Sequence, residues 1–234
     1  MIEQNAYVLH TRPYRENQQL VDLLTEHDGK VSASVYVGQS KRSIKKGLLQ
    51  PFLPVKLMLK AHGNFKSIKH IDATGKSLTL VKNSLFSAFY INELLIRLLT
   101  EQIPCQALFS QYQATLMALA NGEKIAPRLR EFEQKLLAEL GLSFDFTPIF
   151  EHDVSYFYYI AEQGFVPAYE VAPQNSVKYY DKVHLQAIAQ RELGNCSDIT
   201  VEAAHTYKLL MRQIINQLLG NKPLNSRKLF ITNR

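Results

Sequence analysis

The sequence predicts an α+β protein: a five-stranded β-barrel of the OB type at the N-terminus, followed by a mainly α-helical domain. Up to about residue 81, apolar side chains recur with a period near two and β-branched residues are common, as is typical of strands. From residue 83 the period changes to that of amphipathic helices. We therefore expect two domains, 1–80 and 81–234.

Five segments of the first domain have the pattern of strands. They cover residues 6–10, 18–24, 30–37, 55–61 and 66–72. Turn signals, HDGK at 27–30 and HGN at 62–64, separate the second segment from the third and the fourth from the fifth. Short strands with a longer loop between the third and the fourth favour a closed barrel of the OB type. An SH3-like barrel would show much the same spacing.

Helices are predicted for most of the second domain. Their ranges are 83–102, 106–122, 126–141, about 181–193 and 198–219. The third is the clearest, since Pro127 suits a first turn, Gly141 suits the end, and apolar residues align on one face: Leu129, Phe132, Leu136 and Leu140. Asp198 is expected to cap the last helix. Residues 154–160 and 164–169 look extended and predict a small hairpin.

The positive charge of the chain is concentrated in its first third. Residues 1–80 hold 12 Lys and Arg against 6 Asp and Glu, whereas residues 81–234 hold 15 against 15. The whole formal excess of +6 therefore belongs to the predicted barrel. Such a field attracts polyanions, so nucleic acid or an anionic membrane is the expected partner. A basic surface without a partner would explain the charge alone equally well.

The stretch GQSKRSIKKGLLQPF, residues 38–52, gathers much of this charge in the loop between the third and fourth strands. Its four cations are not interrupted by an acid: Lys41, Arg42, Lys45 and Lys46. Loops held by a rigid barrel commonly carry function. The other cations that we expect to contact phosphates are Arg12, Arg15, Lys60 and Lys66. Aromatic residues could stack bases, although a place in the core is the commoner role for each: Tyr7, Tyr14, Tyr36, Phe52 and Phe65.

Motifs of nucleotide, metal and nucleophile chemistry are missing from the sequence. Gly75-Lys76-Ser77 resembles the end of a P-loop, but the earlier glycine of that motif is replaced by His70. The two cysteines, Cys105 and Cys196, stand far apart, whereas structural zinc sites need clustered ligands. There is no G-x-S-x-G motif. We therefore expect no metal, no cofactor and no enzymatic activity.

The sequence also lacks signals for a membrane or for export. No apolar run approaches the roughly 18 residues of a membrane-spanning helix, and the N-terminus MIEQNAYVLH has no apolar core of a secretory signal. A cytoplasmic protein with reduced cysteines is the expectation.

Several motifs, in order along nearly the whole chain, resemble those of the RecO family of bacterial recombination mediators. GQSKRSIKKGLLQPF is similar to the family's glycine, basic run and LQPF, and AYVLHTRPYRENQQLVDLLTEHDGKV looks like its opening strands. YINELLIRLL (90–99) resembles its first helical signature, LREFEQKLLAELG (129–141) its LRxFExxLLxxLG pattern, and PLNSRKLF (223–230) its C-terminal end. The proteobacterial branch is the nearest fit.

This resemblance implies an OB domain, a helical domain and a non-catalytic role in homologous recombination. Such proteins bind single- and double-stranded DNA and anneal complementary strands. With RecR, and in some settings RecF, they help load RecA onto DNA coated by single-strand-binding protein. Many relatives carry a four-cysteine zinc motif after the third helix. The matching region here, LSFDFTPIFEHDVSYFYYIAEQGF, contains no cysteine, so the resemblance implies a zinc-free insert near 142–170.

The resemblance also implies a binding site for the C-terminal tail of single-strand-binding protein, which is acidic and ends in apolar residues. A receptor for such a tail needs a hydrophobic groove with a cation at its rim. The cations beside the apolar face of helix 126–141 are Arg128, Arg130 and Lys135; Arg130 matches the arginine of the family pattern. A solvated amphipathic helix would look the same. Two other functions stay open for the basic loop: gripping an acidic protein as a scaffold, or binding a membrane surface.

Overall fold

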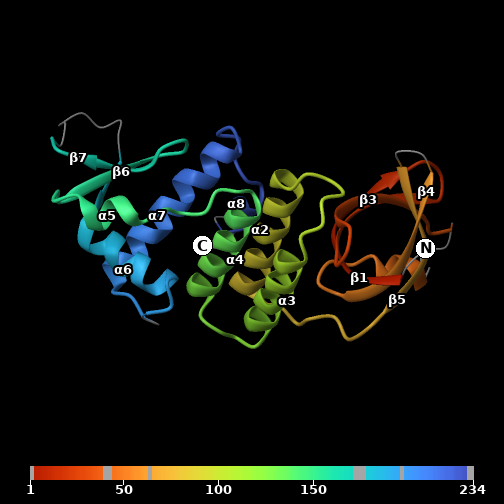
Figure 1. Ribbon diagram of the computed structural model, residues 1–234. Helices are drawn as coiled ribbons and strands as arrows, with labels where there is room; N and C mark the ends of the chain where they lie inside the picture. The colour runs from red at the N-terminus through yellow and green to blue at the C-terminus, as the bar shows by residue number, and fades with distance from the viewer. Residues whose placement is uncertain (1–2, 39–43, 63–64, 171–177, 196–197, 231–234) are drawn as a thin grey trace. The chain divides into compact units, whose positions relative to one another are not determined.

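The computed structural model describes residues 3–38, 44–62, 65–170, 178–195 and 198–230 (Figure 1). It confirms the predicted fold class, a closed five-stranded barrel followed by a helical region. The barrel strands are β1 (Glu3–Tyr14), β2 (Gln18–Thr25), β3 (Gly29–Tyr36), β4 (Pro54–His62) and β5 (Phe65–Ala73). Their order around the barrel is β1-β2-β3-β5-β4, with β4 paired to β1, which is the arrangement expected of an OB-type barrel.

Alternation along β3 contributes to the core of the barrel. In β3, Val31, Ala33 and Val35 are buried in the barrel core, and the residues between them are less buried. This is the two-residue period of a strand with one face inward. The helix α1 (Ile44–Leu48) lies in the chain between β3 and β4, and Leu48 and Leu49 at its end pack on the same core. The basic loop is therefore anchored at its C-terminal end by apolar burial.

Three helices follow the barrel in the same unit: α2 (Lys82–Leu98), α3 (Gln106–Ala120) and α4 (Ile125–Glu139). Helix α2 contacts β1, and α4 packs on α2 and α3. The register of β1 shifts between Val8 and His10, and the carbonyl of Leu9 at this bulge accepts a hydrogen bond from Asn92 Nδ2 at 3.1 Å. Tyr112 OH donates to Asn92 Oδ1 at 2.7 Å. A bulge turns backbone groups out of the hydrogen-bond ladder between strands. Here buried hydrogen bonds link the Leu9 carbonyl to Asn92 of α2, and Asn92 to Tyr112 of α3, so the barrel is joined to both helices.

The β2–β3 turn is held against the segment that follows α2. Gly29 has a φ of +66°, and a Cβ at this position would lie 1.9 Å from the carbonyl oxygen of Ile103. The backbone N–H of Gln102 donates to the carbonyl of Lys30 at 2.8 Å. The left-handed backbone favours glycine, and the close approach requires a residue without a Cβ.

The chain forms two compact units. One comprises Met1–Leu140 together with Leu224–Arg234, and the other comprises Gly141–Pro223. In the first unit, the short helix α8 (Ser226–Leu229) docks on α2. The Glu93 carboxylate accepts hydrogen bonds from the backbone N–H groups of Asn225 and Ser226 and from the Ser226 hydroxyl, at 2.9, 2.8 and 2.6 Å. We call residues 224–230 the C-terminal strap.

The second unit combines helices with a small sheet. Its elements are α5 (Thr147–Glu151), β6 (Tyr156–Ile160), β7 (Gly164–Ala168), β8 (Tyr179–Asp181), α6 (Lys182–Glu192) and α7 (Val201–Leu218). The strand order is β7-β6-β8. The cap of α7 is Thr200, whose Oγ1 accepts from the Ala203 N–H at 3.2 Å. The expected cap at Asp198 is wrong, because the helix begins later and a cap must directly precede it.

Aromatic side chains pack the insert near residues 142–170. Four rings form a cluster with five contacting pairs, whose centroids lie 5.3 to 5.9 Å apart: Phe144, Phe146, Tyr159 and Phe165. Aromatic pairs at this spacing bury large apolar areas.

Among the residues that the structure describes, no three His, Cys, Asp or Glu side chains gather to hold a metal ion. Within the same residues, no helix combines the length and the apolar character needed to cross a membrane.

Candidate nucleic-acid interface

The basic loop ends in the short helix α1, which presents cations on the barrel. Lys45 is exposed and Lys46 is half-buried. The two other cations of the predicted clamp, Lys41 and Arg42, lie outside the described residues. Gly38, at the start of the loop, has a φ of +73°, a backbone conformation that favours glycine. At Gly47, a Cβ would meet open space, so the structure gives no steric reason for a glycine there.

Arg12 and Arg15 lie at the end of β1 and take different roles. The Arg12 guanidinium pairs with Asp22 at 2.9 Å, and that carboxylate also accepts a hydrogen bond from Ser32 Oγ at 2.8 Å. Because the Asp22 side chain is only 8% exposed, part of the Arg12 charge balances a buried acid. Arg15 instead lies over the ring of Tyr14, with its guanidinium carbon 5.2 Å from the ring centroid, which is cation–π geometry.

Lys66 is largely committed to the fold. Its side chain is 17% exposed and pairs with Asp28 at 3.1 Å. Burial alone would raise the pKa of Asp28, but hydrogen bonds from Gln4 and Lys66 and the positive charges of Lys66 and His27 outweigh it and lower that pKa.

Lys60, on β4, is exposed. Within the described part of the chain, Lys45, Lys60 and Arg15 make no ion pair, so they present uncompensated charge.

The structure separates the candidate aromatic residues, which the sequence analysis left unranked. Tyr7 and Phe52 are buried: Tyr7 packs its ring 5.3 Å from that of Tyr112, and Phe52 packs 5.1 Å from Phe89. Tyr36 is 59% exposed. The alternation of β3 carries the signal that distinguishes it, because Val31, Ala33 and Val35 point inward and an even-numbered residue must point outward.

The candidate residues for tail binding lie on α4 and differ in their surroundings. Arg128 is shared by two carboxylates, Glu123 at 2.9 Å and Glu131 at 2.6 Å. Arg130 is mostly buried and pairs with the fully buried Glu133 at 2.7 Å. Lys135 is exposed. The structure therefore places one exposed cation, one partly neutralised cation and one buried cation along this helix.

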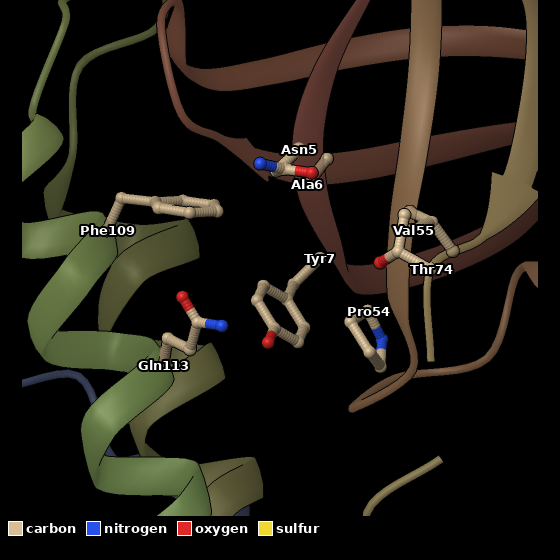
Figure 2. Close-up of a pocket in the computed structure, with 8 residues that line it drawn as sticks. All are labelled: Asn5, Ala6, Tyr7, Pro54, Val55, Thr74, Phe109 and Gln113. Atoms are coloured by element: carbon tan, nitrogen blue, oxygen red, sulfur yellow. The ribbon is translucent and has the colours of Figure 1, made fainter. Parts of the chain in front are cut away.

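A small pocket lies between β1, β4 and α3 in the first unit (Figure 2). The ring of Tyr7 lies between Gln113 of α3 and Pro54 of β4, and burial raises the pKa of Tyr7. The cavity measures about 110 Å³, well below the roughly 300 Å³ or more of pockets for drug-sized ligands. Its lining holds no nucleophile–base pair and no metal-ligating group: Asn5, Ala6, Tyr7, Pro54, Val55, Thr74, Phe109 and Gln113. We assign it no ligand.

Comparison with known proteins gives matches along the chain. The family model described as "Recombination protein O N terminal" matches residues 1–76, and the one described as "Recombination protein O C terminal" matches residues 83–228. Similar curated proteins carry the name DNA repair protein RecO. The one from Alteromonas mediterranea is 33% identical over 97% of this chain and 96% of its own length. The one from Tolumonas auensis is 37% identical, covering 96% and 93%, and the one from Pseudomonas entomophila is 38% identical, covering 97% and 96%.

Two family models that together span nearly all of the chain, and relatives above 30% identity over almost their full lengths, give the same assignment as the barrel, the helical region and the sequence motifs. The chain belongs to the RecO family of DNA repair proteins.

Proposed function

We propose that this chain acts as a recombination mediator. It binds single- and double-stranded DNA through the barrel, anneals complementary strands, and helps load RecA onto DNA coated by single-strand-binding protein. RecR, RecF and the tail of single-strand-binding protein are its proposed partners, and the cytoplasm, at the nucleoid, its proposed location. It works without turnover, metal or cofactor. In this proposal the division of labour follows the sequence, with 1–80 for DNA and 81–234 for protein contacts.

The observation that carries this proposal is the concentration of positive charge on one barrel. Residues 1–80 have a net charge of +6, from 12 cations and 6 acids, and Lys45, Lys60 and Arg15 among them are exposed. Neutralising phosphates releases condensed counterions, so such a surface gains affinity for DNA of any sequence. Arg12 and Lys66 contribute less than the sequence predicts, because each balances an acid of the barrel.

The experiment is a salt titration of DNA binding. We expect replacement of Lys41, Arg42, Lys45 and Lys46 by alanine to weaken binding to all sequences alike. Removal of one cation that neutralises a phosphate lowers the slope of log affinity against log salt by about 0.9 for duplex DNA and about 0.7 for single strands. A count-matched control replaces exposed cations of the second unit: Lys178, Lys208, Arg212 and Lys222.

The outcomes separate the candidate functions. Equal slopes for the loop variant and the unmodified chain would refute the loop as the DNA clamp. Stronger binding to an acidic peptide than to oligonucleotides would favour the protein scaffold, and stronger binding to anionic vesicles would favour a membrane surface.

A further inference from the structure

The strand register places Tyr14, Gln18 and Tyr36 in one row across three strands. Tyr14 of β1 pairs with Gln18 of β2, and Gln18 pairs with Tyr36 of β3. Directly paired residues in antiparallel strands project to the same face of a sheet. Because Tyr36 has the opposite parity to the inward-facing Val35, this row lies on the outside of the barrel.

Tyr36 is the prominent member of the row. It is 59% exposed, and its side chain makes no hydrogen bond, ion pair or ring contact with any other described residue. The neighbouring row on the same face, Arg12, Leu20 and Ser34, is also partly accessible. An exposed aromatic ring offers a flat apolar face on which a ligand with a flat apolar face can stack.

The charges around this row favour an anionic ligand. Arg15 lies over the Tyr14 ring, and the turn that carries it is tied to the end of β3 by the Val37 N–H, which donates to the Asn17 carbonyl at 2.9 Å. From Tyr36 the chain runs directly into the basic loop. Two acids lie nearby: Asp22, which Arg12 already pairs, and the exposed Glu16.

The backbone of the turn supports the same assignment. Arg15 has a φ of +46° and Asn17 has a φ of +61°. Asparagine tolerates this region, but for an arginine the left-handed conformation is strained, because the Cβ comes too close to the following carbonyl oxygen. Backbone strain of this kind is concentrated at functional sites. Here the strained residue is the one whose guanidinium lies over a ring of the row.

We propose that Tyr36, together with Tyr14, forms a stacking platform for the bases of single-stranded DNA, and that Arg15 contacts the phosphates beside it. This inference rests on the proposed function and adds the residues that select unpaired bases. Bases in a duplex are already stacked on their neighbours, so only a single strand offers free base faces to the rings. The platform therefore distinguishes single strands from duplexes, which the loop cations alone do not.

Tyr36→Trp gives a direct test, because the chain contains no tryptophan and the new indole is the only one. We expect its fluorescence to be quenched by a thymidine oligonucleotide and not by an abasic oligonucleotide of the same length, which keeps the phosphates and lacks the bases. Tyr169→Trp is the matched control, since Tyr169 is 75% exposed and lies in the second unit; it should show no quenching with either probe.

Tyr36→Ala measures the contribution to affinity. We expect affinity for the thymidine oligonucleotide to fall between about fivefold and a hundredfold, the range seen when one base–aromatic stack is removed, with duplex binding and thermal stability unchanged. Tyr36→Phe should retain the affinity, because the ring is kept.

The inference would be overturned if Tyr36→Ala bound the thymidine oligonucleotide as tightly as the unmodified chain, or if both probes quenched the indole equally; the proposed function would survive either result. If the unmodified chain bound no DNA at all, the proposed function would fail, and this inference with it.

Discussion

The Arg130 guanidinium lies 2.7 Å from the carboxylate of Glu133, one turn further along α4, and both side chains are inside the fold at 12% and 0% exposure. The same carboxylate oxygen accepts a hydrogen bond from Tyr90 OH of α2 at 2.6 Å. Burial, together with the negative charge of Glu133, raises the pKa of Tyr90 well above its usual value, so the phenol stays a donor. Arg130, which matches the arginine of the family pattern, therefore links α4 to α2 inside the fold, through Glu133 and Tyr90.

We expect Arg130→Ala to destabilise the protein by about 3 kcal/mol or more, because it leaves the carboxylate of Glu133 buried without its counter-charge. The double variant Arg130→Met with Glu133→Gln should recover much of this loss, since neither charge is then left alone. Urea unfolding of the two variants provides the comparison. Equal stability of the single and double variants would show that the unpaired charge of Glu133 is not the cause of the destabilisation.

Binding of an acidic tail should depend on Lys135 without a change in stability. Lys135 is exposed on α4, so Lys135→Ala is expected to weaken binding of an acidic peptide with an apolar C-terminus by up to about fivefold, the size of an exposed ion pair. Lys135→Arg should retain binding, and Lys178→Ala in the second unit serves as the control. Unchanged peptide binding in Lys135→Ala would remove this residue from the proposed tail site.

Gly29→Ala should loosen the contact of the β2–β3 turn with the segment after α2. The new Cβ would meet the Ile103 carbonyl oxygen at 1.9 Å on a backbone with φ of +66°, so we expect a loss above the roughly 1–2 kcal/mol of left-handed strain alone. Gly38→Ala is the matched control, since its φ is +73° but nothing lies within 4 Å of its Cβ. Similar unfolding midpoints for the two variants would mean that the turn moves away from the Ile103 carbonyl with no further loss of stability.

The docking of the C-terminal strap should weaken in acid. Burial alone would raise the pKa of Glu93, but hydrogen bonds from Ser226 and Asn225 and the charge of Arg97 lower it below its ordinary value of 4.5. A carboxyl group whose pKa is lowered by folding stabilises the fold above its unfolded pKa, and this stability is lost as the pH falls through the folded pKa. Docking should therefore persist above about pH 4.5 and decline below it.

Hydrogen exchange of the Ser226 amide, corrected for the intrinsic rate at each pH, measures that docking. Glu93→Gln should raise the exchange rate at neutral pH and abolish its acid dependence, whereas Glu162→Gln, at an exposed position of the second unit, should leave both unchanged. Acid-independent protection in the unmodified chain would contradict the assignment.

The barrel was predictable because its strands obey a local rule. Segment 30–37 was expected and Gly29–Tyr36 is found, since apolar alternation needs no knowledge of the partner strand. The prediction for β1 was too short: residues 11–14 continue the strand, because they pair with β2 across the hairpin. The helices α1, α5 and α8 and the strand β8 were missed, since little more than one turn of helix, or three residues of strand, carries too little periodicity.

The roles of the cations depended on contacts that no local pattern contains. Lys66 pairs with Asp28, 38 residues earlier, and Arg12 pairs with Asp22 across a hairpin. A charge count treats these residues like Lys45, which faces solvent. The exposure of Tyr36, in contrast, followed from the parity of β3 and was available in the sequence once Val31, Ala33 and Val35 were placed in the core.

The C-terminal strap has a consequence for folding of the chain during its synthesis on the ribosome. The first unit is completed by residues that are translated after the whole of Gly141–Pro223. The barrel and α2–α4 emerge early, yet the face of α2 that receives Ser226 and Phe230 has no cover from the strap until residues 224–230 have left the exit tunnel. Domains that are contiguous in sequence fold as they are made. This unit must wait for its final helix, and its α2 face stays open to chaperones during that interval.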